Sequence, residues 1–130
     1  MDITNICKSE YKGVMAVEII FDDTSGGLNV AKWVEHIEKS EKQIFKKFSW
    51  DIEYLKMFGN DIRKGTCPKP ESIKRLKATD DIWQLRIDDY RVFYFYYQDD
   101  IIVMTNVFCK KKNKTPSKEI KKAETLKLKY

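Results

Sequence analysis

The chain has 130 residues, of which 42% are hydrophobic and 13% aromatic, and its formal net charge is +5. This composition is typical of one globular domain with its own core and excludes a disordered chain. No run approaches the roughly 20 apolar residues of a membrane span, and the first residues lack the apolar segment of a secretory signal. The three cysteines are widely spaced and there is a single histidine, so we expect neither a disulfide framework nor a zinc site, and a cytoplasmic location.

The first half of the chain predicts a strand and two helices. Residues 13–21 are rich in Val and Ile, as strands are, and a loop follows at 22–27. Apolar residues then recur at the spacing of one helix face over residues 28–39. Ser40 followed by Gln43 fits a capping box, so a second helix is predicted to begin there and to end at Gly59-Asn60. The tight junction between the two helices predicts an αα-hairpin.

The second half predicts a sheet, because the apolar period changes to two after a loop with two prolines at 63–72. Short connections between the predicted strands favour an antiparallel meander. Thr115 with Pro116 is the pattern of an N-cap followed by proline in the first turn, so a helix is expected to close the chain. We expect strands at about 73–78, 82–87, 90–97 and 101–109, and a terminal apolar face of Ile120, Ala123, Leu126 and Tyr130.

These elements predict a single α+β domain over residues 1–130, with helices on one face of a mainly antiparallel sheet. The basic charge is concentrated at its end, where nine lysines and only two glutamates follow residue 109. Such a segment favours a polyanionic partner or an acidic protein that covers it. It is equally compatible with a solvated lysine-rich helix.

The stretch LRIDDYRVFYF (85–95) places two arginines opposite each other. If Asp88 and Asp89 form a hairpin loop, Arg86 faces Arg91 and both side chains leave the sheet on the same side. Like charges in that position destabilise a sheet by roughly 0.2–1 kcal/mol. A phosphate bound between them would offset this cost, because guanidinium groups bind phosphate oxygens in bidentate fashion. Alternatively, Asp88, Asp89 or other carboxylates neutralise both arginines in a structural network.

The same register can be extended across the next predicted hairpin, with Asp99 and Asp100 as its loop. Arg91 then pairs with Phe108, and Phe93 pairs with Asn106. Phe108 could stack on a base, and Lys74 and Arg75 on the preceding strand are further candidates for this surface. The arginine face holds Gln84, Arg86, Arg91, Phe93, Asn106, Phe108 and Lys110. The opposite face has the composition of a core: Trp83, Leu85, Ile87, Val92, Tyr94, Val103, Thr105 and Val107.

Three segments carry a family resemblance: IWQLRIDDYRVFYFYY (82–97), VFCKKKNKTPSKEIKKA (107–123) and SGGLNVAKWV (25–34). Together they resemble the phage-derived, HigB-like branch of the RelE/ParE toxin superfamily. The resemblance covers roughly residues 14–130 and leaves residues 1–13 as an N-terminal extension. It implies a RelE-like fold, in which an N-terminal strand and a two-helix hairpin pack on the sheet and a helix follows it.

The resemblance further implies the toxin of a type II toxin–antitoxin pair. Such toxins are mostly ribosome-dependent mRNA endonucleases that need no metal or other cofactor, because the RNA 2′-hydroxyl attacks the adjacent phosphate and leaves a 2′,3′-cyclic phosphate. It implies catalytic roles for Arg86, Arg91 and Lys111. RNA contacts would come from Lys74, Arg75, Phe108, Lys110, Lys112 and Lys114. The partners implied are mRNA, the ribosome and an antitoxin of helix-turn-helix type, whose acidic and apolar segment would lie on the helices or across the basic face.

One departure from the family pattern concerns the general base. Many RelE-type nucleases have a tyrosine or histidine near the start of the last helix, where this chain has Thr115-Pro116-Ser117. Tyr90 and Tyr130 are possible substitutes, although the register assigns Tyr90 to the apolar face, and His36 is expected at the surface or the edge of the core. Two other functions therefore stay open: a ParE-like inhibitor of DNA gyrase, and a phage-derived binding module without activity.

Overall fold

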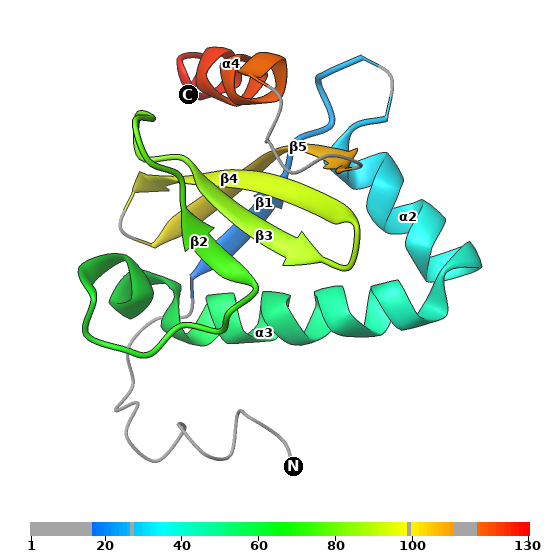
Figure 1. Ribbon diagram of the computed structural model, residues 1–130, viewed down its shortest axis with the longest axis horizontal. Helices are drawn as coiled ribbons and strands as arrows, with labels where there is room; N and C mark the ends of the chain where they lie inside the picture. Colours follow the sequence, from blue (N-terminus) through cyan, green and yellow to red (C-terminus); the bar gives the residue numbers. More distant parts are fainter. Residues whose placement is uncertain (1–16, 27, 99, 111–116) are drawn as a thin grey trace.

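A five-stranded sheet lies between two layers of helices (Figure 1). The computed structural model describes residues 17–26, 28–98, 100–110 and 117–130. Its elements are β1 (Glu18–Phe21), α2 (Val30–Ser40), α3 (Lys42–Lys64), β2 (Ile73–Arg75), β3 (Trp83–Ile87), β4 (Tyr90–Gln98), β5 (Ile101–Cys109) and α4 (Ser117–Lys127). No helix in these ranges is long and apolar enough to cross a membrane.

The strand order is β1-β5-β4-β3-β2, with β1 parallel to β5 and the other neighbours antiparallel. The expected α+β class with a mainly antiparallel sheet is confirmed. The helices, however, do not share one face. The α2–α3 hairpin covers one side of the sheet and α4 covers the other (Figure 1). Two apolar clusters result: a large one with Trp33 and Leu55 from the helix hairpin, and a small one with Ala123 from α4.

The helix hairpin begins with a side-chain cap. The Asn29 side chain accepts a hydrogen bond from the Lys32 backbone N–H at 2.9 Å, which satisfies one of the free donors of the first turn. Val30, Trp33 and Ile37 then occupy one stripe of α2 and are fully buried. Ser40 is the last residue of α2 and Glu41 alone separates it from α3. The predicted αα-hairpin is therefore confirmed.

Both predicted ends of α3 are wrong. No side chain caps its N-terminus, so Ser40 and Gln43 form no capping box. At the other end the helix continues past Gly59 to Lys64, and Gly65 ends it with a positive φ of 77°. Gly59 serves close packing instead, because a Cβ there would lie 3.0 Å from Cδ1 of Ile102.

Two irregularities alter the register between β4 and β5. The predicted pairs of Arg91 with Phe108 and of Phe93 with Asn106 are confirmed. Beyond them Tyr94 pairs with Met104, which leaves Thr105 as an extra residue in β5. A second bulge between Tyr96 and Gln98 compensates for the first.

The bulges move two predicted core residues away from the helix hairpin. Val103 packs in the small cluster under α4. Met104 takes the place in the large cluster that was expected for Val103. The buried Thr105 hydroxyl donates to Oδ1 of Asn106 at 2.6 Å, and its oxygen lies 3.3 Å from the Phe93 carbonyl oxygen. A shift of one residue along a strand moves its side chains to the opposite face of the sheet. This explains why the predicted faces of Val103 and Thr105 were both wrong.

Candidate functional site

The β3–β4 hairpin has the predicted register around its two arginines. Ile87 pairs with Tyr90 and Arg86 pairs with Arg91, with Asp88 and Asp89 as the turn. Asp88 has a φ of 51°, a left-handed conformation that aspartate tolerates better than most residues. The turn therefore fixes the two arginines directly opposite each other at one end of the sheet.

Arg91 is held by the backbone of its own turn. Its Nη1 donates to the carbonyl oxygens of Asp88 at 2.7 Å and of Tyr90 at 2.9 Å. Its Nε is buried and has no partner among the described residues. Burial and then the positive charge of Arg86 lower the pKa of Arg91, and the charge of Asp89 acts in the opposite direction. The two guanidinium groups are thus close enough to repel each other.

Arg86 is exposed, and its side chain has no hydrogen bond or ion pair with any described residue. Its position is set by the backbone, since the Arg86 N–H donates to the Ser72 carbonyl at 2.7 Å. The carboxylate of Asp88 is occupied elsewhere: Lys47 Nζ on α3 lies 2.7 Å from its Oδ1. The carboxylate network that was the alternative explanation for the two arginines is therefore absent around Arg86 in the part of the chain that the structure describes.

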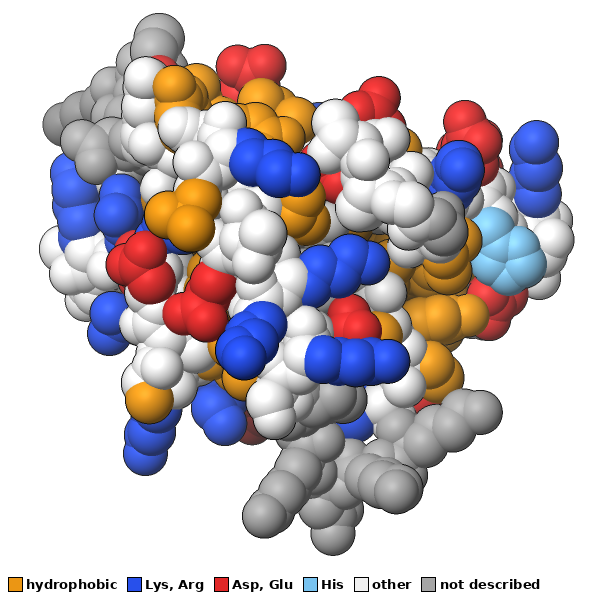
Figure 2. All heavy atoms as spheres, turned by 90° about the horizontal axis from the view of Figure 1, so that it is seen from above, with side chains coloured by type: hydrophobic (Ala, Val, Ile, Leu, Met, Phe, Trp, Pro, Cys, Tyr) orange, Lys and Arg blue, Asp and Glu red, His pale blue; other side chains and the backbone are white. Residues whose placement is uncertain are grey.

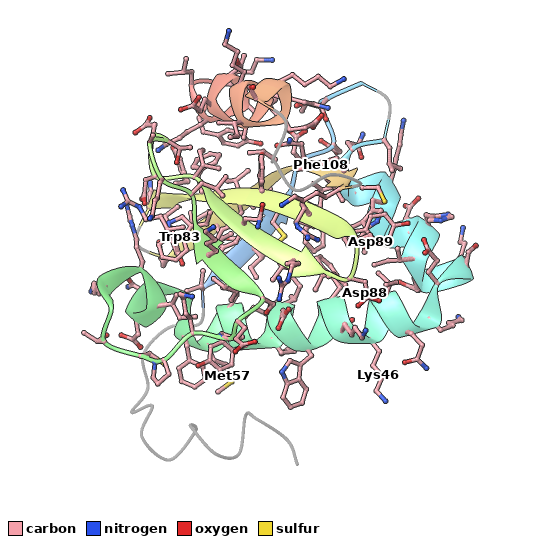
Figure 3. All side chains as sticks on the ribbon, viewed as in Figure 1. Lys46, Met57, Trp83, Asp88, Asp89 and Phe108 are labelled. Atoms are coloured by element: carbon pink, nitrogen blue, oxygen red, sulfur yellow. The ribbon has the colours of Figure 1, made fainter. Side chains whose placement is uncertain are left out.

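Strand β5 adds an aromatic ring and a lysine to this end of the sheet. Phe108 lies opposite Arg91, is partly buried and meets Phe93 edge to face at 5.2 Å. The Lys110 N–H donates to the Asp89 carbonyl at 2.7 Å, so the chain leaves the sheet beside the turn (Figure 3). The predicted site residues Lys111, Lys112 and Lys114 lie outside the described residues.

The remainder of the arginine face is covered by α4. Asn106 is fully buried, and its Nδ2 donates to the Glu119 carbonyl at 3.2 Å and to Glu119 Oε1 at 3.1 Å. Gln84 is also buried, whereas Arg86, Arg91, Phe108 and Lys110 remain at the open end. Figure 2 shows lysine and arginine side chains spread over the α4 side of the molecule, with acidic side chains between them.

Lys74 and Arg75 point in different directions from the edge strand β2. Lys74 pairs with Gln84 and is exposed on the face that carries the arginines. Arg75 belongs to the opposite face, where its Nε lies 2.8 Å from Oδ1 of Asp81. Burial acts to raise the pKa of Asp81, but hydrogen bonds from Arg75 and Trp83 outweigh it and the pKa is lowered. Arg75 is thus engaged in an ion pair away from Arg86 and Arg91.

The side chains of Tyr90 and Tyr130, the two candidate general bases, lie apart from those of the arginines, and so does His36, which was expected at the surface or the edge of the core. Tyr90 packs edge to face against Trp33 at 5.2 Å, and its hydroxyl donates to Glu41 at 2.7 Å. That hydrogen bond, together with burial, raises the pKa of Tyr90. His36 is a surface residue paired with the same carboxylate at 3.0 Å. Tyr130 contacts Phe95 and Tyr97, near the other end of β4.

Four residues of α3 that sequence reasoning did not select also lie beside the hairpin. Lys46, Lys47, Trp50 and Asp51 line a cavity of about 690 Å³ together with Arg86 and Asp88. Asp51 is buried, and this burial raises its pKa to about 6 against the effect of a hydrogen bond from Ser72. The sequence around Asp51, which lies among apolar residues of the helix, does not indicate a functional role. Only the fold brings this residue under β3. Within the described ranges no three His, Cys, Asp or Glu side chains gather to hold a metal ion.

Comparison with known proteins identifies the family. A search of curated proteins returns no matching sequence. The family model described as phage derived protein Gp49-like (DUF891) matches residues 35–127. This range covers the second half of α2, all of α3, the two arginines of the β3–β4 hairpin, and α4. The chain therefore belongs to the Gp49-like family of phage-derived proteins, within the RelE/HigB-like superfamily of toxin–antitoxin toxins.

Proposed function

We propose that the protein is the toxin of a toxin–antitoxin pair and that it cleaves mRNA at the ribosome without a metal. One observation carries the proposal: Arg86 and Arg91 are paired across the hairpin, and the Arg86 guanidinium has no partner among the described residues. A protein gains no stability from two facing cations. An anion bound between them would remove the repulsion and use their donors.

The chemistry that fits two guanidinium groups is attack by the RNA 2′-oxygen on the adjacent phosphorus. The new P–O2′ bond forms as the P–O5′ bond breaks, which gives a 2′,3′-cyclic phosphate and a free 5′-hydroxyl. The 2′-hydroxyl proton passes to a base, and the departing 5′-oxygen takes up a proton. Negative charge builds up on the nonbridging phosphate oxygens, where planar bidentate donors stabilise it best.

Each arginine has a distinct part in this proposal. Arg91 is oriented by two backbone carbonyls that engage its Nη1, so its Nη2 donors are fixed in place for a phosphate oxygen. Arg86 is exposed on the neighbouring strand β3, from which it is proposed to contact the phosphate on the side opposite Arg91. Phe108 and Lys110 adjoin the same end and are proposed to contact the base and the backbone of the substrate. Lys111 and Lys112 are proposed to assist proton transfer.

An antitoxin is the proposed protein partner. Its binding segment would be acidic and apolar, because the open end of the hairpin combines cations with the ring of Phe108. Such a segment would also keep RNA away from the arginines. Co-purification of the neighbouring gene product with the wild-type chain, and its reduced capture by the double variant Arg86→Ala/Arg91→Ala, would support contact at this surface.

The function is tested by inducing the chain in bacteria and mapping mRNA 5′ ends by primer extension. The wild-type chain is expected to arrest growth and to create new ends inside translated codons. Arg86→Ala should produce neither, whereas Lys64→Ala, on the far end of α3, should behave as the wild type. Growth arrest without new ends would assign the target to gyrase or another protein and would overturn the nuclease proposal.

A further inference from the structure

A cavity of about 690 Å³ lies between α3 and the β3–β4 turn, on the helix side of Arg86. Its volume is within the range of small-molecule and nucleotide sites. The walls combine cationic, aromatic and carboxylic side chains: Lys46, Lys47, Trp50, Asp51, Ser72 and Arg86. The proposed reaction uses only Arg86 from this set, so the cavity requires a separate explanation.

The spacing along α3 explains how its side chains meet. Lys46 and Trp50 are four residues apart, as are Lys47 and Asp51, so each pair lies one above the other on the helix surface. Figure 3 shows Lys46 extending from α3 on the side away from the sheet, with Asp88 above the helix. These two pairs of side chains on α3 form one wall of the cavity, and the β3–β4 turn forms the other.

Trp50 is the exposed tryptophan of the molecule. It is 46% exposed, whereas Trp33 and Trp83 are 0% and 5% exposed. An indole at the rim of a cavity offers a flat surface for a planar ligand, and nucleic-acid bases stack on such surfaces without sequence preference. Nothing in the core requires this ring, since the buried stripe of α3 runs through Phe48, Ile52 and Leu55.

The charge around the rim is cationic. Lys46 and Arg86 have no ion-pair partner among the described residues, while Lys47 shares its charge with Asp88 at 2.7 Å. Two unpaired cations beside an exposed indole select a ligand that is both anionic and aromatic. A nucleotide has this combination of a phosphate and a planar base.

Asp51 and Ser72 add polar groups to the lining of the cavity. Asp51 is 6% exposed and accepts a hydrogen bond from the Ser72 side chain. Burial raises its pKa to about 6, so the carboxyl is mainly an acceptor at neutral pH and gains a donor when it is protonated at mildly acidic pH. A base edge presents donors and acceptors of both kinds.

We propose that this cavity binds one nucleotide of single-stranded RNA next to the cleaved bond, with its base on Trp50, its phosphate at Arg86 and the positive charge of Lys46 at the rim. The proposal rests on the proposed function, because it takes RNA as the substrate. It adds a second contact region on α3 that would hold the strand across the hairpin turn. Arg86 belongs to both regions and would link binding in the cavity to the position of the scissile phosphate.

The test is a binding titration with a fluorescein-labelled RNA hexamer whose 2′-hydroxyls are methylated, so that it cannot be cleaved by the proposed reaction. Trp50→Ala is expected to weaken binding about tenfold, as loss of one stacked base does. Trp50→Phe should retain most of the affinity, because phenylalanine still stacks. Unlabelled hexamer should quench the tryptophan fluorescence of the wild type and not that of Trp50→Phe, since the other two tryptophans are buried.

A charge reversal provides the second arm. Lys46→Glu should weaken binding of the hexamer and reduce the salt dependence of that binding. Lys64→Glu, about 27 Å further along the same helix, is the control and should have little effect on the affinity or on its salt dependence. Near-identical affinities of the wild type, Trp50→Ala and Lys46→Glu for the hexamer would overturn the proposal. So would loss of antitoxin capture by Trp50→Ala with RNA binding intact, which would assign the cavity to a protein.

The two proposals fail separately. Hexamer binding that depends on Trp50, with no RNA cleavage by the wild type, would support the cavity and contradict the nuclease. Cleavage by Trp50→Ala at the wild-type rate and with the wild-type KM would support the nuclease and contradict the cavity.

Discussion

At the scale of single residues, the two hairpin arginines look equivalent in the sequence and differ in the structure. Arg91 is partly buried and donates to two carbonyls of its own turn, while Arg86 is exposed and has no described partner. Arg91 therefore contributes to folding as well as to binding. Arg86 is placed for binding alone, and substitutions at the two positions should have different effects on stability.

We expect Arg91→Ala to lower the free energy of unfolding by about 1–2 kcal/mol, because the turn loses two hydrogen bonds from a charged donor. Arg86→Ala should change it by less than about 0.5 kcal/mol, as exposed substitutions usually do. Urea denaturation of the two variants and the wild type at one pH measures both values. Equal destabilisation by the two substitutions would contradict the different roles of the arginines.

The buried carboxyl of Asp51 makes a second prediction at this scale. Its pKa of about 6 in the folded chain lies above the ordinary aspartate value of 3.8, so the folded state binds the proton more tightly than the unfolded state. The stability contributed by this group is therefore greatest at low pH and falls as the pH rises toward and through 6. The hydrogen bond from Ser72 lowers the pKa of the carboxyl but does not cancel the effect of burial.

Asp51→Asn should remove this dependence. Relative to the wild type, the variant should gain on the order of 1 kcal/mol in unfolding free energy between pH 5 and pH 8. Urea denaturation of both proteins at the two pH values gives the double difference, in which the other titrating groups cancel. Parallel stability curves for variant and wild type would mean that Asp51 ionises as freely in the folded chain as in the unfolded one.

At the scale of elements, α4 packs on β4 and β5 through a short apolar stripe and a few polar contacts. Only Ala123 and Leu126 of this helix are buried, and Asn106 of β5 donates two hydrogen bonds to Glu119 in its first turn. The helix covers the inner part of the arginine face and leaves the hairpin end open. Its attachment therefore determines how much of that face RNA or an antitoxin can reach.

Asn106→Ala should lower the unfolding free energy by about 1–3 kcal/mol, because the hydrogen bonds to Glu119 are lost and the Thr105 hydroxyl loses a partner. Hydrogen exchange should become faster in the amides of α4 and stay unchanged in β3. Lys118→Ala, on the exposed side of the same turn, is the matched control. Unchanged protection of α4 in Asn106→Ala would show that its other contacts hold the helix, among them those of Glu124 and Lys127 with Asp80.

Some features of the fold could be predicted from the sequence, and others could not. The pairing of Arg86 with Arg91 followed from a two-residue turn and the period of a strand, which are local properties. The bulge at Thr105 had no such signal, because threonine is a good strand former and no glycine or proline marks the position. Gly59 has the pattern of a helix end, yet its role is set by Ile102, 43 positions further along the chain. The cavity residues of α3 depend on the same kind of long-range contact.

At the scale of the whole molecule, the helix hairpin and α4 enclose the sheet from both sides and leave one end accessible. The paired arginines, Phe108 and the start of the lysine-rich segment all lie at that end, and the α3 cavity adjoins it. A long polyanion could contact both regions at once. Under the proposed function, this end of the sheet holds the scissile phosphate of RNA.

The most direct test uses purified protein, ribosomes and one defined mRNA, with analysis of the chemical form of the new 3′ ends. We predict 2′,3′-cyclic phosphate ends in the presence of a metal chelator that leaves the ribosomes intact, and cleavage about 10²–10³-fold slower with Arg86→Ala. Lys64→Ala should cleave as the wild type does. Cleavage by Arg86→Ala at the wild-type rate, or no cleavage by the wild-type chain, would contradict the account.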